Sequence, residues 1–203
     1  MDDIECEVRS FISEGRYREL ISFFNENAEG RGEDEQVTYY YDTAQDLRIQ
    51  LNRSGSKIWL KEGRLHDRSR KEIEVPCRRD DFGKLQELFT ALGHEVEIKW
   101  YRKRRNYRWQ GIDVALDHTR GYGYIIELER KSSATQASGT VADLERRLRD
   151  LGIEPTPREE FTRRYEEYRR EWRRLVGDEG PTVMAGPGRR PGPFPIDTDR
   201  QVQ

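Results

Sequence analysis

Residues 5–9 read Glu-Cys-Glu-Val-Arg, and the spacing of their two glutamates recurs in Glu72-Ile-Glu74 and Glu127-Leu-Glu129. In a β-strand alternate side chains lie on one face, so each pair places two carboxylates together, about 7 Å apart. Carboxylates at that spacing repel each other unless a cation or a basic side chain lies between them. The pattern therefore predicts strands that have one ionic face and one apolar face.

The same alternation extends along the chain. It predicts strands over residues 5–11, 37–41, 47–52, 57–61, 70–75, 96–109, 112–117 and 124–130. Apolar residues at helical spacing predict helices over residues 13–27, from 80 or 81 to 92, over 140–151 and from about 157 to 176, whereas residues 29–36 (EGRGEDEQ) are predicted to form a loop. The short connections between strands favour antiparallel pairing and an α+β fold.

Eight twisted antiparallel strands tend to close on themselves. We therefore expect an α+β fold built on an eight-stranded antiparallel closed β-tunnel, or barrel, with surrounding helices. Residues 1–176 are expected to form this single domain, because no linker interrupts them. Residues 177–203 contain five glycines and five prolines and lack any periodic pattern, which predicts a flexible tail.

The composition excludes several classes of protein. The chain has 37 basic and 39 acidic side chains, a net charge of −2 and a pI near 6.1, which argues against a general nucleic-acid binder. The chain has no run of 18 apolar residues and no secretory signal, so we expect no membrane span. Cys6 and Cys77 form no metal or redox spacing, which favours a reduced, cytoplasmic protein.

The direction in which the ionic faces point decides the function. For any one strand, the simplest interpretation is a half-exposed sheet whose polar face meets water. If the sheet closes with its ionic faces inward, it forms a channel with acids on one wall and Arg and Lys on others. Paired carboxylates hold hard cations such as Mg²⁺ or Mn²⁺, and Arg and Lys grip phosphate oxygens. This arrangement predicts a metal-assisted polyphosphate site.

Six short motifs follow one another along the chain. They are Glu5-Cys-Glu-Val-Arg9, Leu47-Arg-Ile-Gln50, Trp59-Leu-Lys61, Arg70-Lys-Glu-Ile-Glu74, Arg102-Lys-Arg-Arg-Asn-Tyr107, and Leu116-Asp117 followed by Gly121-Tyr-Gly123 and Glu127-Leu-Glu129. In this order they resemble the motifs of the CYTH superfamily, or triphosphate tunnel metalloenzymes, over about residues 3–170. The superfamily includes thiamine, inorganic and RNA triphosphatases and class IV adenylyl cyclases. The resemblance implies a tunnel fold that acts on a triphosphate.

The resemblance also implies roles for individual residues. Metal ligands for Mg²⁺ or Mn²⁺ would be Glu5, Glu7, Glu127 and Glu129, with Glu72 and Glu74 as a further acidic pair. Phosphate-binding residues would be Arg48, Lys61, Arg102 and Arg104, with Arg163 capping the tunnel from the last helix. Arg9 near the metal, Lys61 and the inward-facing Asp117 would take part in catalysis.

The chain departs from the family pattern at several positions. Arg9 replaces the lysine that ends the first motif, and Gln50 replaces the second base of L-R-x-R. Arg102 stands where lysine is usual, and the opposite strand face, with Lys103 and Arg105, is an open alternative for the tunnel side. The His-Phe dipeptide that precedes the first motif in class IV cyclases is absent, which argues against a cyclase.

Three functions are consistent with the residues. The first is a divalent-metal-dependent triphosphatase that acts on tripolyphosphate, thiamine triphosphate or a nucleoside triphosphate. The second is a class IV-type adenylyl cyclase that makes cyclic AMP from ATP. The third is a non-catalytic module that binds polyphosphate or a triphosphate end. In each case the expected partner is a triphosphate-containing small molecule, with no membrane and no nucleic acid except an RNA triphosphate end.

Overall fold

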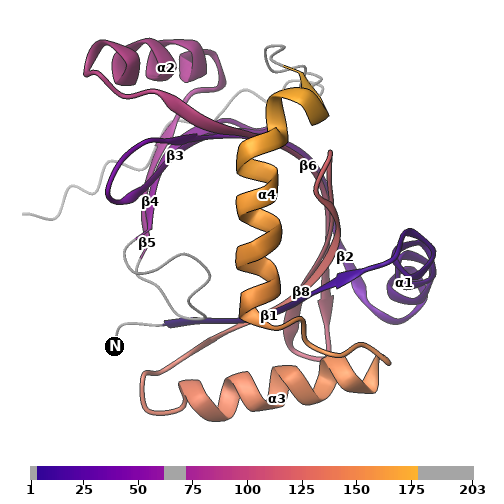
Figure 1. Cartoon of the computed structure of the whole chain (residues 1–203). Coiled ribbons are helices and arrows are strands. Elements are labelled where there is room, and N and C mark those ends of the chain that lie inside the picture. Colours follow the sequence, from indigo (N-terminus) through magenta and orange to yellow (C-terminus); the bar gives the residue numbers. More distant parts are fainter. Residues whose placement is uncertain (1–3, 62–71, 178–203) are drawn as a thin grey trace, which may run out of the picture.

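The computed structural model describes residues 4–61 and 72–177, which form an α+β fold with eight strands and four α-helices (Figure 1). The strands are β1 (Ile4–Ile12), β2 (Glu29–Tyr41), β3 (Asp46–Leu51), β4 (Ser56–Lys61), β5 (Glu72–Cys77), β6 (Val96–Trp109), β7 (Ile112–Thr119) and β8 (Gly123–Ser132). The helices are α1 (Glu14–Asn27), α2 (Phe82–Ala91), α3 (Ala137–Asp150) and α4 (Arg158–Val176). The start of the strand predicted over 70–75 and the tail from residue 178 lie outside the described residues.

The strands form one antiparallel sheet in the order β1-β8-β7-β6-β2-β3-β4-β5. The sheet curves strongly, so that β3–β5 face β6 and β2 across the molecule (Figure 1). This confirms the predicted fold class. The sheet differs from a fully hydrogen-bonded barrel, because within the described residues β1 and β5 pair with one neighbour each and form two edges.

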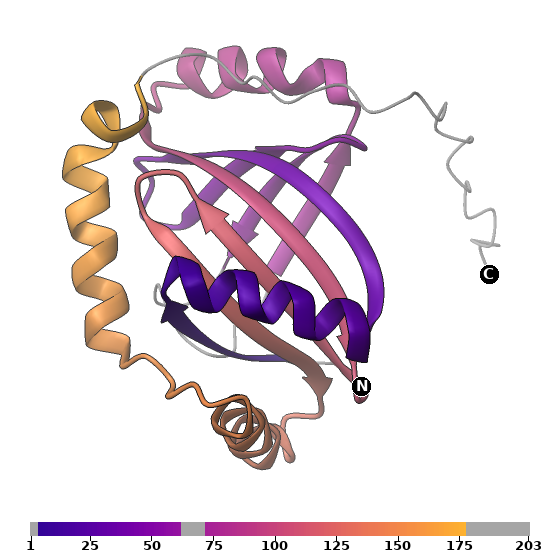
Figure 2. The same ribbon diagram turned by 90° about the vertical axis from the view of Figure 1, so that its right-hand side faces the viewer.

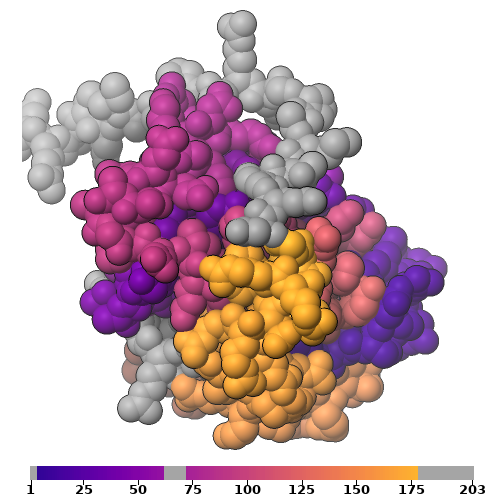
Figure 3. Space-filling view, turned by 45° about the horizontal axis from the view of Figure 1, so that its top comes forward, coloured from indigo at the N-terminus to yellow at the C-terminus, as the bar shows by residue number. Residues whose placement is uncertain are grey.

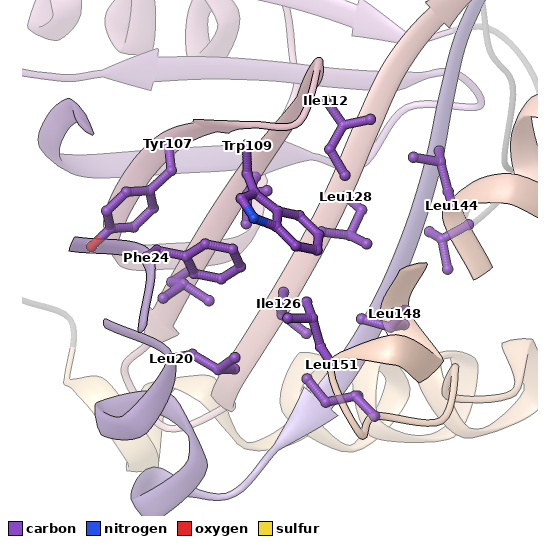
Figure 4. Packing of buried hydrophobic residues seen from close by; sticks show 14 of the residues in the cluster. Leu20, Phe24, Tyr107, Trp109, Ile112, Ile126, Leu128, Leu144, Leu148 and Leu151 are labelled. Carbon is purple, nitrogen blue, oxygen red and sulfur yellow. The ribbon is translucent and has the colours of Figure 1, made fainter. Parts of the chain in front are cut away.

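The largest hydrophobic core lies outside the curved sheet, between the strands and helices α1 and α3. It includes Cys6 and Val8 of β1, which alternate with the ionic residues of the same strand. Figure 4 shows aromatic residues of β6 packed against Leu20 and Phe24 of α1, and leucines of α3 approaching β8. The apolar faces therefore point outward to the helices, which leaves the ionic faces on the concave side.

Two further helices cover other parts of the sheet. Helix α2 packs on the outer side of the sheet through Phe82, beside Tyr39 and Ile49. Helix α4 crosses one end of the curved sheet, as the two ribbon views agree (Figures 1 and 2), and its side chains cover this side of the molecule in the space-filling view (Figure 3). Tyr168 Oη donates to the Lys99 carbonyl and Trp172 Nε1 to the Glu97 carbonyl, each at 2.8 Å, which fixes α4 to β6.

The first half of β2 corrects the sequence prediction, which assigned residues 29–36 to a loop. These residues pair with β6, and the ion pairs of Glu33 with Arg105 and of Glu35 with Lys103 link the two strands. Opposite charges on neighbouring strands stabilise a sheet without apolar alternation. The register shifts between Gly30 and Gly32, where Gly32 has a φ of 96° that side chains rarely adopt.

The helix predictions hold to within a few residues. Ser13 caps α1, because its Oγ accepts from the Arg16 amide at 3.1 Å. The helix predicted from residue 140 begins three residues earlier, at Ala137. Among the described residues no helix is long and apolar enough to cross a membrane.

Candidate active site

The concave side of the sheet encloses a cavity of about 270 Å³. Its wall is made by inward side chains of all eight strands and of α4. Twelve of the residues singled out in the sequence line it: Glu5, Glu7, Arg9, Arg48, Lys61, Glu72, Glu74, Arg102, Arg104, Asp117, Glu127 and Glu129. The ionic faces therefore meet in one cavity, which is most open to solvent at β5, where the Glu74 side chain is 46% exposed.

The acidic wall is formed where β1 pairs with β8. In this register Glu7 lies directly opposite Glu129, and Arg9 lies opposite Glu127. Like charges directly opposite each other destabilise a sheet. Burial and the nearby carboxylates of Glu127, Glu5 and Glu7 raise the pKa of Glu129 to about 7. The wall thus carries negative charge that its own bases do not fully neutralise.

These carboxylates suit a divalent cation in their chemistry. Hard cations prefer carboxylate oxygens. Burial, and after it repulsion from neighbouring carboxylates, raises the pKa values of Glu129 and Glu5, and a bound cation would relieve that repulsion. Within residues 4–61 and 72–177, no three acidic, His or Cys side chains are gathered closely enough to form a ready metal site. The donor set fits Mg²⁺ or Mn²⁺, and its side chains would have to converge on the ion.

The wall beside β8 centres on Asp117 of β7, and Arg104 reaches from there to Glu127 with 3.3 Å between Nη2 and Oε1. Arg104 Nε and Nη2 donate to its two carboxylate oxygens at 2.8 and 2.7 Å, and Arg102 Nη1 donates to Oδ2 at 3.2 Å. Burial raises the pKa of Asp117, but the two guanidinium groups outweigh burial and hold it below the usual range. Lys103 and Arg105 instead pair with acids of β2 and lie outside this cavity, so the open question of strand face is decided for Arg102 and Arg104.

A second group of bases comes from β3 and β4. Arg48 is buried, donates from Nε to Asp46 Oδ1 at 2.6 Å and stacks on Tyr40, with 4.3 Å from Cζ to the ring centroid. Lys61 forms an ion pair with Glu72. Lys57, four residues before Lys61 on the same strand face, also lines the cavity and pairs with Glu74 at 2.5 Å.

Aromatic residues close the end of the cavity that α4 covers, and the candidate site predicted from the sequence did not include them. Trp100 and Tyr122 lie with ring centroids 4.5 Å apart, and Phe161 of α4 stacks on Phe11 at 4.6 Å. Tyr165 of α4 also lines the cavity. The signal for Trp100 was its position two residues before Arg102 on the same strand, which places both on one face.

Arg163 corrects a sequence prediction. Expected to cap the tunnel, it lies instead on the exposed side of α4 and donates to Glu160 and Glu167. Gln50, which replaces a base of the family motif, is buried on the inner side and donates to Thr38 Oγ1 at 3.0 Å. The side-chain amide of Gln50 therefore links β3 to its neighbour β2.

The cavity as a whole is almost neutral. Six basic side chains line it: Arg9, Arg48, Lys57, Lys61, Arg102 and Arg104. Seven acidic side chains line it: Glu5, Glu7, Glu72, Glu74, Asp117, Glu127 and Glu129, which leaves a formal charge of 6 − 7 = −1. A polyanion that enters this cavity therefore adds negative charge that the protein alone does not balance.

Comparison with known proteins gives the family and the fold. The family model described as the CYTH domain matches residues 3–161. The protein PH1819 from Pyrococcus horikoshii OT3 has a similar structure, with a TM-score of 0.66 and 26% identity over 80% of this chain and 98% of that one. No curated protein matches the chain by sequence.

Two solved structures with lower identity share the fold. A candidate adenylate cyclase from Vibrio parahaemolyticus has a TM-score of 0.59 and 13% identity, over 80% of this chain and 99% of that one. HpAC1 from Hippeastrum, a candidate adenylyl cyclase described as having a dominant triphosphatase activity, has a TM-score of 0.58 and 18% identity, over 82% and 96% of the two chains.

Proposed function

Because this chain belongs to the CYTH domain family, we propose that it binds a triphosphate-containing small molecule in its cavity, with Mg²⁺ or Mn²⁺, and hydrolyses the terminal phosphoanhydride. The observation that carries the proposal is the division of one cavity into an acidic wall on β1 and β8 and basic groups on β3, β4 and β6. The shared fold with HpAC1, described as a triphosphatase, supports the choice of reaction.

The basic side chains would bind the phosphate chain. Arg102 and Arg104 present planar guanidinium groups that match phosphate oxygens in pairs, and Lys61 supplies a compact charge. Asp117 holds the two arginines in place through its hydrogen bonds with both. These bases would neutralise the charge that builds on the transferred phosphoryl group in the transition state.

The acidic side chains would hold the divalent cation. Glu5, Glu7, Glu127 and Glu129 are the proposed ligands, with Glu72 and Glu74 as a further pair. When bound, the cation supplies the positive charge that the nearly neutral cavity lacks for a polyanion. Arg9 lies opposite Glu127 in the sheet and stacks on Phe161 with 4.7 Å from Cζ to the ring centroid, which places it between the acidic wall and the aromatic end.

The proposed reaction is the attack of water on the terminal phosphorus. A new bond forms between the water oxygen and phosphorus, and the bond to the bridging oxygen breaks. The products are orthophosphate, which keeps the water oxygen, and the shortened chain, which keeps the bridging oxygen, and the proton that the water loses passes to the shortened chain or to solvent. The aromatic side chains at the α4 end would limit access of bulk water to this end of the cavity.

Phosphate release tests the proposal. Wild-type protein is incubated with tripolyphosphate, ATP and thiamine triphosphate, with Mg²⁺, Mn²⁺ or EDTA. We expect metal-dependent release from at least one substrate, and at least a hundredfold loss in the double variant Glu127→Gln/Glu129→Gln. Glu87→Gln, an exposed glutamate on α2, is the matched control and should retain wild-type activity.

Other outcomes would change the assignment. Turnover that survives in the Glu127→Gln/Glu129→Gln variant would refute the metal ligands proposed here. Formation of cyclic AMP from ATP without phosphate release would assign a cyclase. Tight triphosphate binding without either product would assign a binding module, and Arg9→Lys and Gln50→Arg would then be the first variants to test.

A further inference from the structure

Trp59 lies among the basic side chains that β3 and β4 contribute to the cavity, Arg48, Lys57 and Lys61. On β4 it lies between Lys57 and Lys61, two positions away from each, so the three side chains share the inner face. On the neighbouring strand β3, Arg48 is its direct cross-strand partner. Three cationic side chains therefore surround one indole ring.

All three cations contact the face of this ring. The Nζ atoms of Lys57 and Lys61 each lie 4.0 Å from the ring centroid of Trp59, and Arg48 Cζ lies 5.1 Å from it. An aromatic ring attracts cations through its negative face, and tryptophan does so most strongly. Each of the three bases also has a carboxylate partner, Asp46, Glu74 or Glu72, and the indole adds a further attraction shared by all three.

The carboxylates around these bases act differently from the ring. Glu74 pairs with Lys57, Glu72 pairs with Lys61, and Trp59 Nε1 donates to Glu72 Oε2 at 2.9 Å. Phosphate oxygens would compete with these carboxylates for the same ammonium protons. The ring attraction uses no acceptor atom, so it persists while the ammonium groups turn their protons toward phosphate.

We propose that Trp59 is a positioning residue that holds Arg48, Lys57 and Lys61 in place for the phosphate chain. The inference rests on the proposed function, because it assumes a polyphosphate in this cavity. It also adds to that function: the wall around Trp59 recognises the phosphate chain itself, whatever leaving group is attached. Substrates with and without an aromatic leaving group should therefore depend on Trp59 equally.

Calorimetric titration with non-hydrolysable imido analogues of tripolyphosphate and of ATP, both in Mg²⁺, tests the proposal. Trp59→Leu removes the aromatic face, and we expect about tenfold weaker binding of both ligands. Trp59→Phe keeps an aromatic face but lacks the N–H group, so its affinity should lie between those of wild type and the leucine variant. In turnover assays Trp59→Leu should raise KM by a larger factor than it lowers kcat.

Two controls separate positioning from a general loss of structure. Trp109→Phe changes a tryptophan in the core beneath α1 and should leave both affinities within twofold of wild type. In the Lys57→Met background, Trp59→Leu should weaken binding by a smaller factor than in wild type, because one of the cations it positions is already gone. Equal factors in the two backgrounds would overturn the proposal.

Each remaining outcome has a definite meaning. A loss confined to the ATP analogue would show that the indole contacts the leaving group, and it would overturn the proposal. A phenylalanine variant as weak as the leucine variant would assign the effect to the N–H group and overturn the role of the ring. Wild-type affinity in Trp59→Leu would overturn this inference alone, whereas no binding of the tripolyphosphate analogue by wild type would overturn the proposed function and this inference with it.

Discussion

Replacing Asp117 should change both the stability of the protein and its response to a phosphate ligand. Its side chain is 4% exposed and neutralises both Arg102 and Arg104. Asp117→Asn leaves two guanidinium groups short of a counter-charge, and we expect a loss of about 3 kcal/mol in the free energy of unfolding, measured in urea. Because phosphate can replace the lost charge, tripolyphosphate should raise the Tm of this variant more than that of wild type. An equal rise in both proteins would contradict the role of these arginines in phosphate binding.

Tyr41 gives a residue-scale prediction outside the site. Its hydroxyl is buried and has no hydrogen-bond partner among the described residues. Tyr41→Phe should therefore leave stability unchanged or raise it by about 1 kcal/mol. Tyr168→Phe is the matched control, since that hydroxyl donates to the Lys99 carbonyl, and it should cost about 1 kcal/mol. Urea unfolding of both variants decides the point, and a clear loss in Tyr41→Phe would contradict it.

The same hydroxyl predicts a pH dependence. Burial raises the pKa of Tyr41 from 10.0 to about 12 in the folded protein. The unfolded chain therefore loses this proton first: the group leaves the unfolding free energy independent of pH below pH 10 and lowers it as the pH rises from 10 toward 12. Tyr41→Phe should flatten the fall in unfolding free energy over this window. A slope unchanged by the substitution would show that other groups cause the alkaline loss.

At the scale of elements, alternation predicted the strands that have one face on the apolar core, such as β1 and β4. It failed for residues 29–36, because that half of β2 is held by ion pairs with β6, and one strand read alone does not reveal its partner. On α4, the spacing of Phe161, Tyr165 and Tyr168 marks the buried face. Arg163 lies about 200° around the helix from Phe161, so helical geometry already placed it on the outer side.

Helix α4 should depend on Trp172 for its place against the sheet. This side chain is almost fully buried against Ile98 and Tyr168, and its N–H group donates to the Glu97 carbonyl. Trp172→Ala should cost about 3–5 kcal/mol in unfolding free energy, measured in urea. Arg170→Ala, an exposed change on the same helix, should cost less than about 0.5 kcal/mol. A cost below about 1 kcal/mol for Trp172→Ala would mean that α4 is not anchored there.

At the scale of the whole molecule, twelve of the cavity residues were predicted from the sequence on two grounds. Strand alternation placed the paired glutamates on shared faces, whereas the choice of Arg102, Arg104 and Asp117 came from the family resemblance. The sequence could not predict the aromatic end, since Phe161 and Tyr165 reach the cavity only through the path of α4 across the curved sheet. Nor could it show that β1 and β5 are left as edges within the described residues, because strand count alone does not fix closure. The nearly equal numbers of acidic and basic side chains that line the cavity can likewise be counted only in the folded structure.

We propose that the acidic side chains of this cavity bind a metal ion and that its basic side chains bind the phosphate chain. Crystals grown with Mn²⁺ and a non-hydrolysable imido analogue of tripolyphosphate, measured at the manganese absorption edge, test it directly. We expect an anomalous peak among Glu5, Glu7, Glu127 and Glu129, with the phosphate chain against Arg48, Arg102 and Arg104. A manganese peak or a phosphate chain bound elsewhere on the protein, with the cavity empty, would contradict the claim.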